Sequence, residues 1–292
     1  MTAISPSFPA DLLPAKLRMG AVRLRLRDAA RSIAYYRDTI GLSLIGTDGA
    51  ISRLGVGSDV LIELEAAPDA SARPRNATGL FHVAILVPSR VALAVVLRRL
   101  VAHGVRLGAS DHLVSEALYM DDPDGNGIEI YRDRLPGEWN WDGPVVEMAT
   151  KHLDLRALLA EAPASVPLDE PMPVGTVVGH VHLQVGEIAG AKRFYVDRLG
   201  FDITTDRYPG ALFVSAGRYH HHLGLNVWQS RGGGAPPAGS IGLVHYEVML
   251  PDTAALDVVR ARMSQAGEAV GVIEGGLALA DPWGTLVHFR AA

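Results

Sequence analysis

One stretch of this sequence occurs twice. Gly179–Phe201 reads GHVHLQVGEIAGAKRFYVDRLGF, and Gly20–Leu42, 159 positions earlier (179 back to 20), reads GAVRLRLRDAARSIAYYRDTIGL. Both copies show a short alternating strand pattern, a helical segment with two adjacent aromatic residues, and a glycine that ends the helix. The chain is therefore a tandem duplication, and the two copies can be compared for the chemical groups that each retains.

Each half of the duplication contains two similar modules. A strand, a helix and three short strands are predicted over about residues 20–67, and the same order returns over about 79–134. The second half repeats this plan over about 178–228 and 242–290. The predicted fold class is thus α+β, with four modules in tandem.

The sheet of one module is too small to cover both of its faces, so we expect the modules to pair and to enclose a cup. The long linker between the two halves favours pairing of neighbouring modules. This gives four segments: an N-terminal arm at 1–18, an N-terminal domain at 19–134, a linker with a short helix at 135–176, and a C-terminal domain at 177–292.

The composition excludes several classes of protein. The formal net charge of the 292 residues is -5 with both signs interspersed, which argues against a nucleic-acid partner. There is no cysteine, so disulfides, thiolate metal sites and a cysteine nucleophile are excluded. No apolar run approaches roughly 20 residues and no signal pattern is present, so we expect a cytoplasmic protein with no membrane partner. Phosphate-binding loops, serine elbows and HExxH motifs are also absent from the sequence, which argues against phosphoryl transfer and serine hydrolysis.

Histidines recur at the first strands of the modules. His82, His180 and His245 open these strands in the second, third and fourth modules, whereas Ala21 has the equivalent position in the first. A single strand histidine is more often a half-buried side chain bonded to the backbone than a ligand. The recurrence favours a shared function.

The last strands of the modules offer a second set of candidates. The runs DPDGNGIEIY and DPWGTLVHFR align at the same offset and set Glu129 against His288. Side chains at such symmetric strand positions converge on a cup wall, where imidazole and carboxylate groups are ligands for a divalent metal. Glu63 is a further candidate ligand, and a solvated position on an edge strand is its alternative.

A run of three histidines, YHHHLGLN, is the most unusual local feature. We place it in a strand, so that His220 and His222 share one face and His221 points to the other. A wet site explains such a run better than a core, and an imidazole there is a candidate acid or base near neutral pH. Tyr119 is a candidate for contact with a bound phenol or enol, with ordinary packing as its alternative.

Five motifs carry a resemblance to a known family: GHVHLQV, the aromatic pair before LGF, YHHHLGLN, DHLVSEALYMDDPDGNGIEIYRDR and DPWG. They resemble the vicinal-oxygen-chelate superfamily of glyoxalases, bleomycin-resistance proteins and dioxygenases, and especially its two-domain catechol 2,3-dioxygenase-like members. The resemblance implies paired βαβββ modules and a divalent metal held by two first-strand histidines and a last-strand glutamate. This metal is iron(II) in the dioxygenases, with Mn, Ni and Zn as alternatives.

Carried over residue by residue, the resemblance gives the C-terminal half an incomplete site. The candidates there are His180 and His245 as ligands, His288 at the place of the family's glutamate, and His222 or His220 near the catalytic histidine. Ala278 stands where the family's tyrosine is expected.

The N-terminal half has the opposite losses, because it keeps Tyr119 and Glu129 and has Ala21 at a ligand position. The second and third modules together hold a complete set, which is His82, Glu129, His180 and His222. A second hypothesis is therefore that these two modules share one cup, within the chain or across a dimer. A separation above about 10 Å between His180 and Glu129 would exclude it, since a metal lies about 2 Å from its ligands.

Three functions are compatible with this pattern. The first is an extradiol ring-cleaving dioxygenase that acts on a catechol-type diol with O2. The second is a glyoxalase-like isomerase or lyase, for which Glu63, His82 and Glu129 are the ligands. The third is a non-catalytic module that binds a small hydrophobic molecule, as bleomycin-resistance proteins do, and Ala21, Ala278 and His288 favour it. The oligomeric state is left open, with a homodimer as one arrangement.

Overall fold

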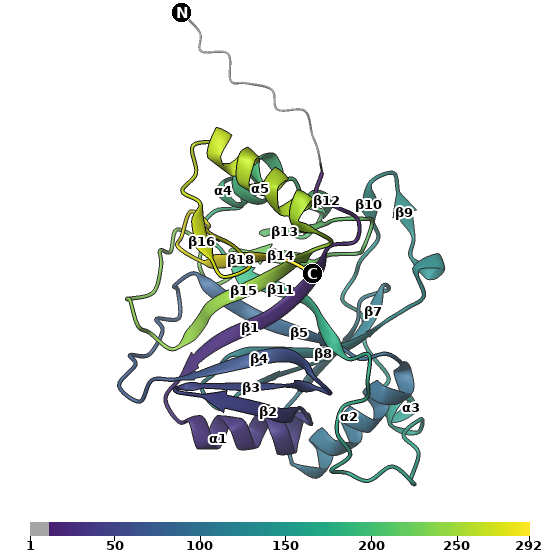
Figure 1. Ribbon diagram of the computed structural model, residues 1–292. Coiled ribbons are helices and arrows are strands. Elements are labelled where there is room, and N and C mark those ends of the chain that lie inside the picture. Colours follow the sequence, from purple (N-terminus) through teal and green to yellow (C-terminus); the bar gives the residue numbers. More distant parts are fainter. Residues whose placement is uncertain (1–11) are drawn as a thin grey trace, which may run out of the picture.

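The computed structural model describes residues 12–292 and contains the four expected modules (Figure 1). Residues 1–11 of the predicted arm lie outside the described part. Within the remainder of the arm, Leu13 and Leu17 are buried in the core, and the Leu13 amide donates to the Gly200 carbonyl at 2.9 Å. This part of the arm is therefore packed on the third module.

The modules repeat one order of elements, with the following bounds. Module one is β1 (Arg18–Leu26), α1 (Ala29–Ala34), the π-helical turn η1 (Tyr35–Ile40), β2 (Ser43–Asp48), β3 (Ile51–Val56) and β4 (Asp59–Ala66). Module two is β5 (Gly79–Leu86), α2 (Arg90–Ala102), β6 (Gly108–Asp111), β7 (Ser115–Asp121) and β8 (Gly127–Asp133). Module three is β11 (Val177–Gln184), α4 (Ile188–Ala191), the π-helical turn η3 (Lys192–Arg198), β12 (Asp202–Thr205), β13 (Ala211–Ser215) and β14 (Leu223–Asn226). Module four is β15 (Gly242–Leu250), α5 (Thr253–Gln265), β16 (Gly271–Ile273), β17 (Gly276–Ala280) and β18 (Leu286–Ala291).

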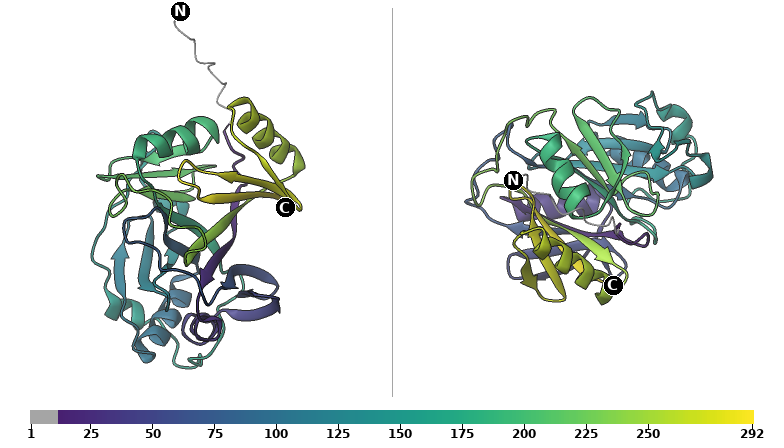
Figure 2. Two further views of the ribbon diagram at one scale, coloured as in Figure 1. Left: turned by 90° about the vertical axis from the view of Figure 1, so that its left-hand side faces the viewer. Right: turned by 90° about the horizontal axis from the view of Figure 1, so that it is seen from above.

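The pairing of the modules differs from the expectation. One sheet has the order β16-β17-β18-β15-β1-β4-β3-β2 and joins modules four and one, whereas the other has the order β12-β13-β14-β11-β5-β8-β7-β6 and joins modules three and two. The first strands meet antiparallel at the centre of each sheet. Modules two (blue) and four (yellow) therefore lie on opposite sides of the molecule in both views of Figure 2. The prediction of neighbour pairing is wrong, because strand alternation shows that a face needs a partner and does not specify which module supplies it.

Neighbouring modules still touch, through a helix and a turn. The hydroxyl of Tyr36, in η1, donates to Asp122 Oδ2 in the β7–β8 turn at 3.1 Å. The second half repeats the contact, with Tyr195 donating to Asp281 Oδ2 at 3.0 Å. The second aromatic of each repeated pair thus holds a buried aspartate of the following module.

We expect Tyr36→Phe to lower the free energy of unfolding by about 1.5 kcal/mol, because a buried carboxylate loses one hydrogen bond. Urea denaturation measures this change. The matched control is Tyr35→Phe, because the Tyr35 hydroxyl donates to the Asp121 carbonyl in an exposed contact. This control should change the free energy of unfolding by less than about 0.5 kcal/mol. Equal effects of the two variants would contradict the role given to Tyr36.

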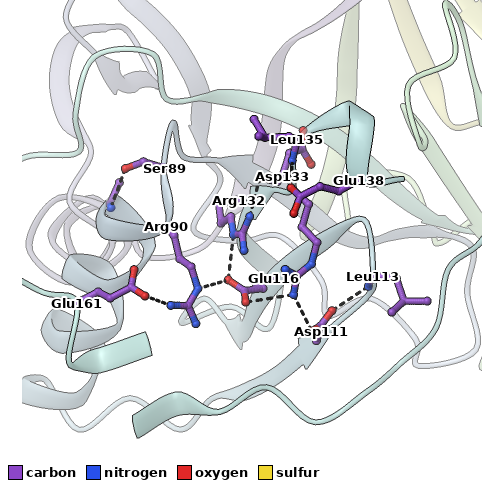
Figure 3. A network of polar contacts seen from close by, with 12 residues as sticks. Ser89, Arg90, Asp111, Leu113, Glu116, Arg132, Asp133, Leu135, Glu138 and Glu161 are labelled. Carbon is purple, nitrogen blue, oxygen red and sulfur yellow. Dashed lines mark hydrogen bonds and ion pairs between the residues drawn. The ribbon is translucent and has the colours of Figure 1, made fainter. Parts of the chain in front are cut away.

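The linker carries η2 (Pro136–Glu138), the short strands β9 (Trp141–Asp142) and β10 (Val145–Val146), and α3 (Leu155–Leu159). Helix α3 lies beside α2 (Figure 1), with Leu158 buried in the core. Buried Glu116 on β7 forms the centre of a polar network there (Figure 3), bonded to Arg90 at 2.7 Å and to Arg132 at 2.9 Å. Burial raises the pKa of Glu116, but these two guanidinium groups outweigh it and hold the pKa below its usual value.

In the described part of the chain, no helix has the length and apolar character needed to span a membrane.

Candidate metal centre

Three buried side chains converge where modules two and three meet. His82 lies on β5, Glu129 on β8 and His180 on β11. Glu129 Oε2 is 2.9 Å from His82 Nε2 and 3.1 Å from His180 Nε2, and the three ligand atoms all lie within 4.8 Å of one another. Strand register explains the convergence, because Ala84 stands opposite both His180 and Glu129 on its two neighbouring strands.

The hypothesis that modules two and three share one cup meets its distance criterion, since His180 and Glu129 are in direct contact rather than more than about 10 Å apart. Three of the four members of the candidate set, His82, Glu129 and His180, are thus assembled in one place. His245 and His288 lie on the other sheet. They are therefore not co-ligands of His180.

The three residues fit a divalent transition metal. His82 Nε2 is buried without a hydrogen bond although Glu129 is close, and His180 Nδ1 is buried without a partner among the described residues. Burial raises the pKa of Glu129, yet His180 and His82 outweigh it and hold that pKa well below its usual value. Burial also lowers the pKa of His180 despite Glu129, which favours the neutral imidazole that binds a metal. Two imidazoles and one carboxylate form a donor set typical of such metals.

The three residues line a cavity of about 280 Å³. Its other walls are mainly aromatic and imidazole side chains: Phe81, His112, Tyr119, His182, Tyr208, Phe213, His221 and Trp228. Phe81 stands edge-on to both His182 and Trp228, with ring centres 5.0 and 5.5 Å apart. Ligand cavities are usually about 300–1,000 Å³, so this one suits a small, flat molecule.

The three-histidine run lies in the loop before β14, because that strand begins only at Leu223. The alternation predicted for a strand therefore does not apply. His221 lines the cavity, with its ring centre 4.1 Å from that of His180. His220 and His222, the two predicted catalytic candidates, are turned elsewhere: His220 Nε2 lies 2.7 Å from Asp133 Oδ1, and His222 Nδ1 lies 2.9 Å from Ser215 Oγ. Burial lowers the pKa of His222 to about 3.

The cavity residues that are not among the predicted site residues include His182 and His221. His182 was open to prediction, since residues i and i+2 of a strand share a face and His180 was already a candidate. Gly224 lies opposite His182 in the parallel register, and a Cβ there would approach the His182 ring to 2.8 Å. The glycine therefore makes room for this imidazole.

Tyr119 lines the cavity and stands opposite Glu129 on the neighbouring strand. His112 Nδ1 is 2.8 Å from the Ala149 carbonyl and must donate to it, so His112 Nε2 accepts from the Tyr119 hydroxyl at 2.7 Å. Burial, followed by the Glu129 charge, raises the pKa of Tyr119 well above its usual value. The cavity thus contains a phenol that stays protonated.

The other cup has a different character. Glu63, on β4, bonds to Arg23 at 2.8 Å and to Arg53 at 3.2 Å, so it is neither an open ligand nor on the same sheet as His82 and Glu129. Ala278 on β17 stands opposite His288 on β18. The corresponding pair in the first cup is Tyr119 and Glu129.

That cup also has its own group of potential ligands, His245, Glu247 and His288. The two imidazole rings stack at 3.9 Å, and Glu247 bonds to Arg290 at 2.6 Å. Burial, then His288, lowers the pKa of His245 to about 3.

The sequence profile of the Glyoxalase/Bleomycin resistance protein/Dioxygenase superfamily matches residues 18–130 and 177–289, and the chain belongs to this superfamily. The catechol-2,3-dioxygenase of Bacillus subtilis (strain 168) is 43% identical over 273 residues, which are 90% of this chain and 93% of that relative. A solved Bacillus subtilis structure has a TM-score of 0.66 at 13% identity, covering 94% of this chain and 84% of the other. Glyoxalase I from Zea mays has a TM-score of 0.58 at 17% identity, covering 94% and 92%. Both solved structures share their fold with this chain. The predicted α+β class, with tandem βαβββ modules that form cups, is confirmed.

Proposed function

We propose that this protein is a metal-dependent extradiol dioxygenase that opens the ring of a catechol-type diol, with Fe(II) as its metal. The observation that carries the proposal is the buried group of His82, Glu129 and His180 at the wall of an aromatic cavity. The 43% identity to a catechol-2,3-dioxygenase over most of both chains supports the same chemistry.

His82, His180 and Glu129 would hold the metal. When bound, it supplies Lewis-acid charge for the two adjacent oxygens of a diol and electrons for dioxygen. The protein's own contribution begins with the substrate ring, which Phe81, Phe213 and Trp228 enclose within a small cavity. This size favours a single-ring diol over a biphenyl-type substrate.

His221 is the candidate base of this reaction. It lies beside His180 in the cavity wall, where its Nε2 can take the proton from a diol hydroxyl. Burial, followed by the neighbouring His180, holds the pKa of His221 well below its usual value, so the ring is neutral before the transfer. Tyr119 stays protonated because its pKa is raised, and its hydroxyl hydrogen is directed to His112 Nε2.

The two other functions have less support from the geometry. The glyoxalase-like alternative needs Glu63 beside His82 and Glu129, but Glu63 is on the other sheet and is paired with two arginines. The binding-module alternative was based on Ala21, Ala278 and His288, and all three belong to the strands of the other cup.

The test is oxygen consumption by full-length protein that has been purified anaerobically and loaded with Fe(II). We expect about one O2 consumed per catechol, and mass spectrometry with labelled dioxygen should find both of its atoms in the ring-opened product. Isomerisation of a hemithioacetal by the Ni- or Zn-loaded protein without O2 uptake would support the glyoxalase-like function instead. Tight binding of catechol that a chelator does not weaken, without turnover, would support the binding module.

A further inference from the structure

A chain of hydrogen bonds connects the cavity histidine to a carboxylate outside the cavity. His221 Nδ1 lies 2.8 Å from His220 Nδ1, and His220 Nε2 lies 2.7 Å from Asp133 Oδ1. The other oxygen of Asp133 accepts from the Tyr219 hydroxyl at 2.9 Å. His220 is fully buried, whereas the Asp133 side chain is 21% exposed. The chain of hydrogen bonds thus runs from Asp133, at the end of β8 in module two, through His220 in the loop of module three to His221 in the cavity wall.

The two ends of this chain restrict where its hydrogens lie. An ionised carboxylate only accepts, so the Nε2 of His220 must carry a hydrogen for Asp133. A neutral His220 then has a lone pair on Nδ1, and this lone pair requires a hydrogen on the Nδ1 of His221. His221 is consequently left with a lone pair on Nε2, because its hydrogen bond to a described residue is made through Nδ1, to His220.

We propose that Asp133 and His220 are positioning residues that orient His221 and fix its tautomer, so that an unprotonated Nε2 faces the cavity. The proposal rests on the dioxygenase function for its purpose, since a base there must present a lone pair to the substrate hydroxyl. The logic is that of a carboxylate that holds a catalytic imidazole in one tautomer through the nitrogen remote from the substrate. In this protein a second histidine stands between the carboxylate and the base.

Aromatic side chains pack around His220 and so support the pair of His220 and His221. Trp139, from the linker, is edge-on to His220 with ring centres 5.2 Å apart, and the ring centre of Tyr219 lies 4.1 Å from that of His220. Arg218, with φ +59, sits over the Trp141 ring at 4.3 Å and fixes the turn that starts the loop. These ring contacts restrict the rotation of the His220 side chain, which keeps its two nitrogens directed at Asp133 and His221.

The first test is nitrogen-15 NMR of the full-length, metal-free chain labelled at histidine, with the His221 signals identified by their loss in His221→Asn. We expect a single tautomer with hydrogen on Nδ1 and none on Nε2. In Asp133→Asn an amide replaces the acceptor-only carboxylate, so both tautomers of His221 should appear. A single tautomer with hydrogen on Nε2 in the unaltered protein, or no change in Asp133→Asn, would overturn the proposal.

The second test is steady-state kinetics of the iron-loaded protein. Asp133→Asn should lower kcat by about tenfold to a hundredfold, as expected for a misoriented base, with KM changed less than about threefold. Tyr219→Phe is the matched control, because it removes the other hydrogen bond to the same carboxylate and leaves the Asp133–His220 bond in place. The same tautomer mixture and loss of kcat in Tyr219→Phe would mean general loosening of the loop and would refute the positioning role. If the unaltered protein consumes no O2, the dioxygenase function fails, and the NMR result still decides the tautomer.

Discussion

His180→Ala and His82→Ala are expected to abolish iron binding and with it ring cleavage. Each variant removes one of the three proposed ligands and leaves the buried Glu129 carboxylate with a single imidazole neighbour. Loss of a group that merely orients a ligand already lowers metal affinity 10- to 100-fold, so loss of a ligand should lower it by at least about 100-fold. Metal analysis of the anaerobically loaded and desalted protein measures the effect, and we expect less than about a tenth of the normal iron.

The duplication supplies a matched control for this experiment. His245→Ala changes the same type of residue at the equivalent first-strand position of the other cup, and His288→Ala changes the partner of its ring. Both variants should retain about one iron per chain and the oxygen consumption of the unaltered protein. Loss of iron in His245→Ala, with iron retained in His180→Ala, would place the metal in the cup of modules one and four. That result would refute the proposed ligand set of His82, Glu129 and His180.

Arg99→Met is expected to lower the free energy of unfolding by about 3 to 5 kcal/mol. Arg99 on α2 is 1% exposed, and its guanidinium donates to the carbonyls of Ile40, Leu168 and Glu170. These contacts join the end of the first module's helix and the linker to the second module. Methionine fills a similar volume but donates nothing, so three carbonyls lose their donor at about 1 to 3 kcal/mol each, reduced where water can reach them.

Gly41 shows how closely this guanidinium is fitted. Its φ of +98 ends η1 in the left-handed conformation, and a Cβ at this position would collide with the Arg99 head group. Chemical denaturation measures the predicted loss. Arg98→Met, one residue earlier on the same helix, is the control, since Arg98 also donates to two linker carbonyls but is only half-buried. A loss in Arg99→Met no larger than in Arg98→Met would contradict the central role of Arg99.

The two cups have diverged in chemistry while keeping one fold. At the place where the cavity has His182 opposite Gly224, the other cup has Arg23 opposite Glu63, which bond to each other. The Arg23–Glu63 ion pair therefore occupies the positions that His182 and Gly224 have in the cavity. The complementary losses in the two halves of the sequence follow from this division, because each half contributes one module to each cup.

The sequence by itself determined the repeats, the order of elements within each module and most of the candidate ligands. These features depend on local patterns: alternation marks the strands, aspartate and serine cap the helices, and the histidine and glutamate positions recur at a constant offset. The family resemblance added the expectation of a metal, and Glu129 with His82 and His180 lies in one buried group as the second hypothesis required.

Only the tertiary structure decided which modules share a sheet and which histidine of the run faces the cavity. Module pairing depends on how whole strand faces fit across β5 and β11, and alternation is the same for every possible partner. The run at His220, His221 and His222 lies in a loop, where no period relates one side chain to the next. His220 bonds to Asp133, which is remote in sequence on β8, and His222 bonds to Ser215 on β13. These two contacts turn His220 and His222 away from the cavity and leave His221 facing it.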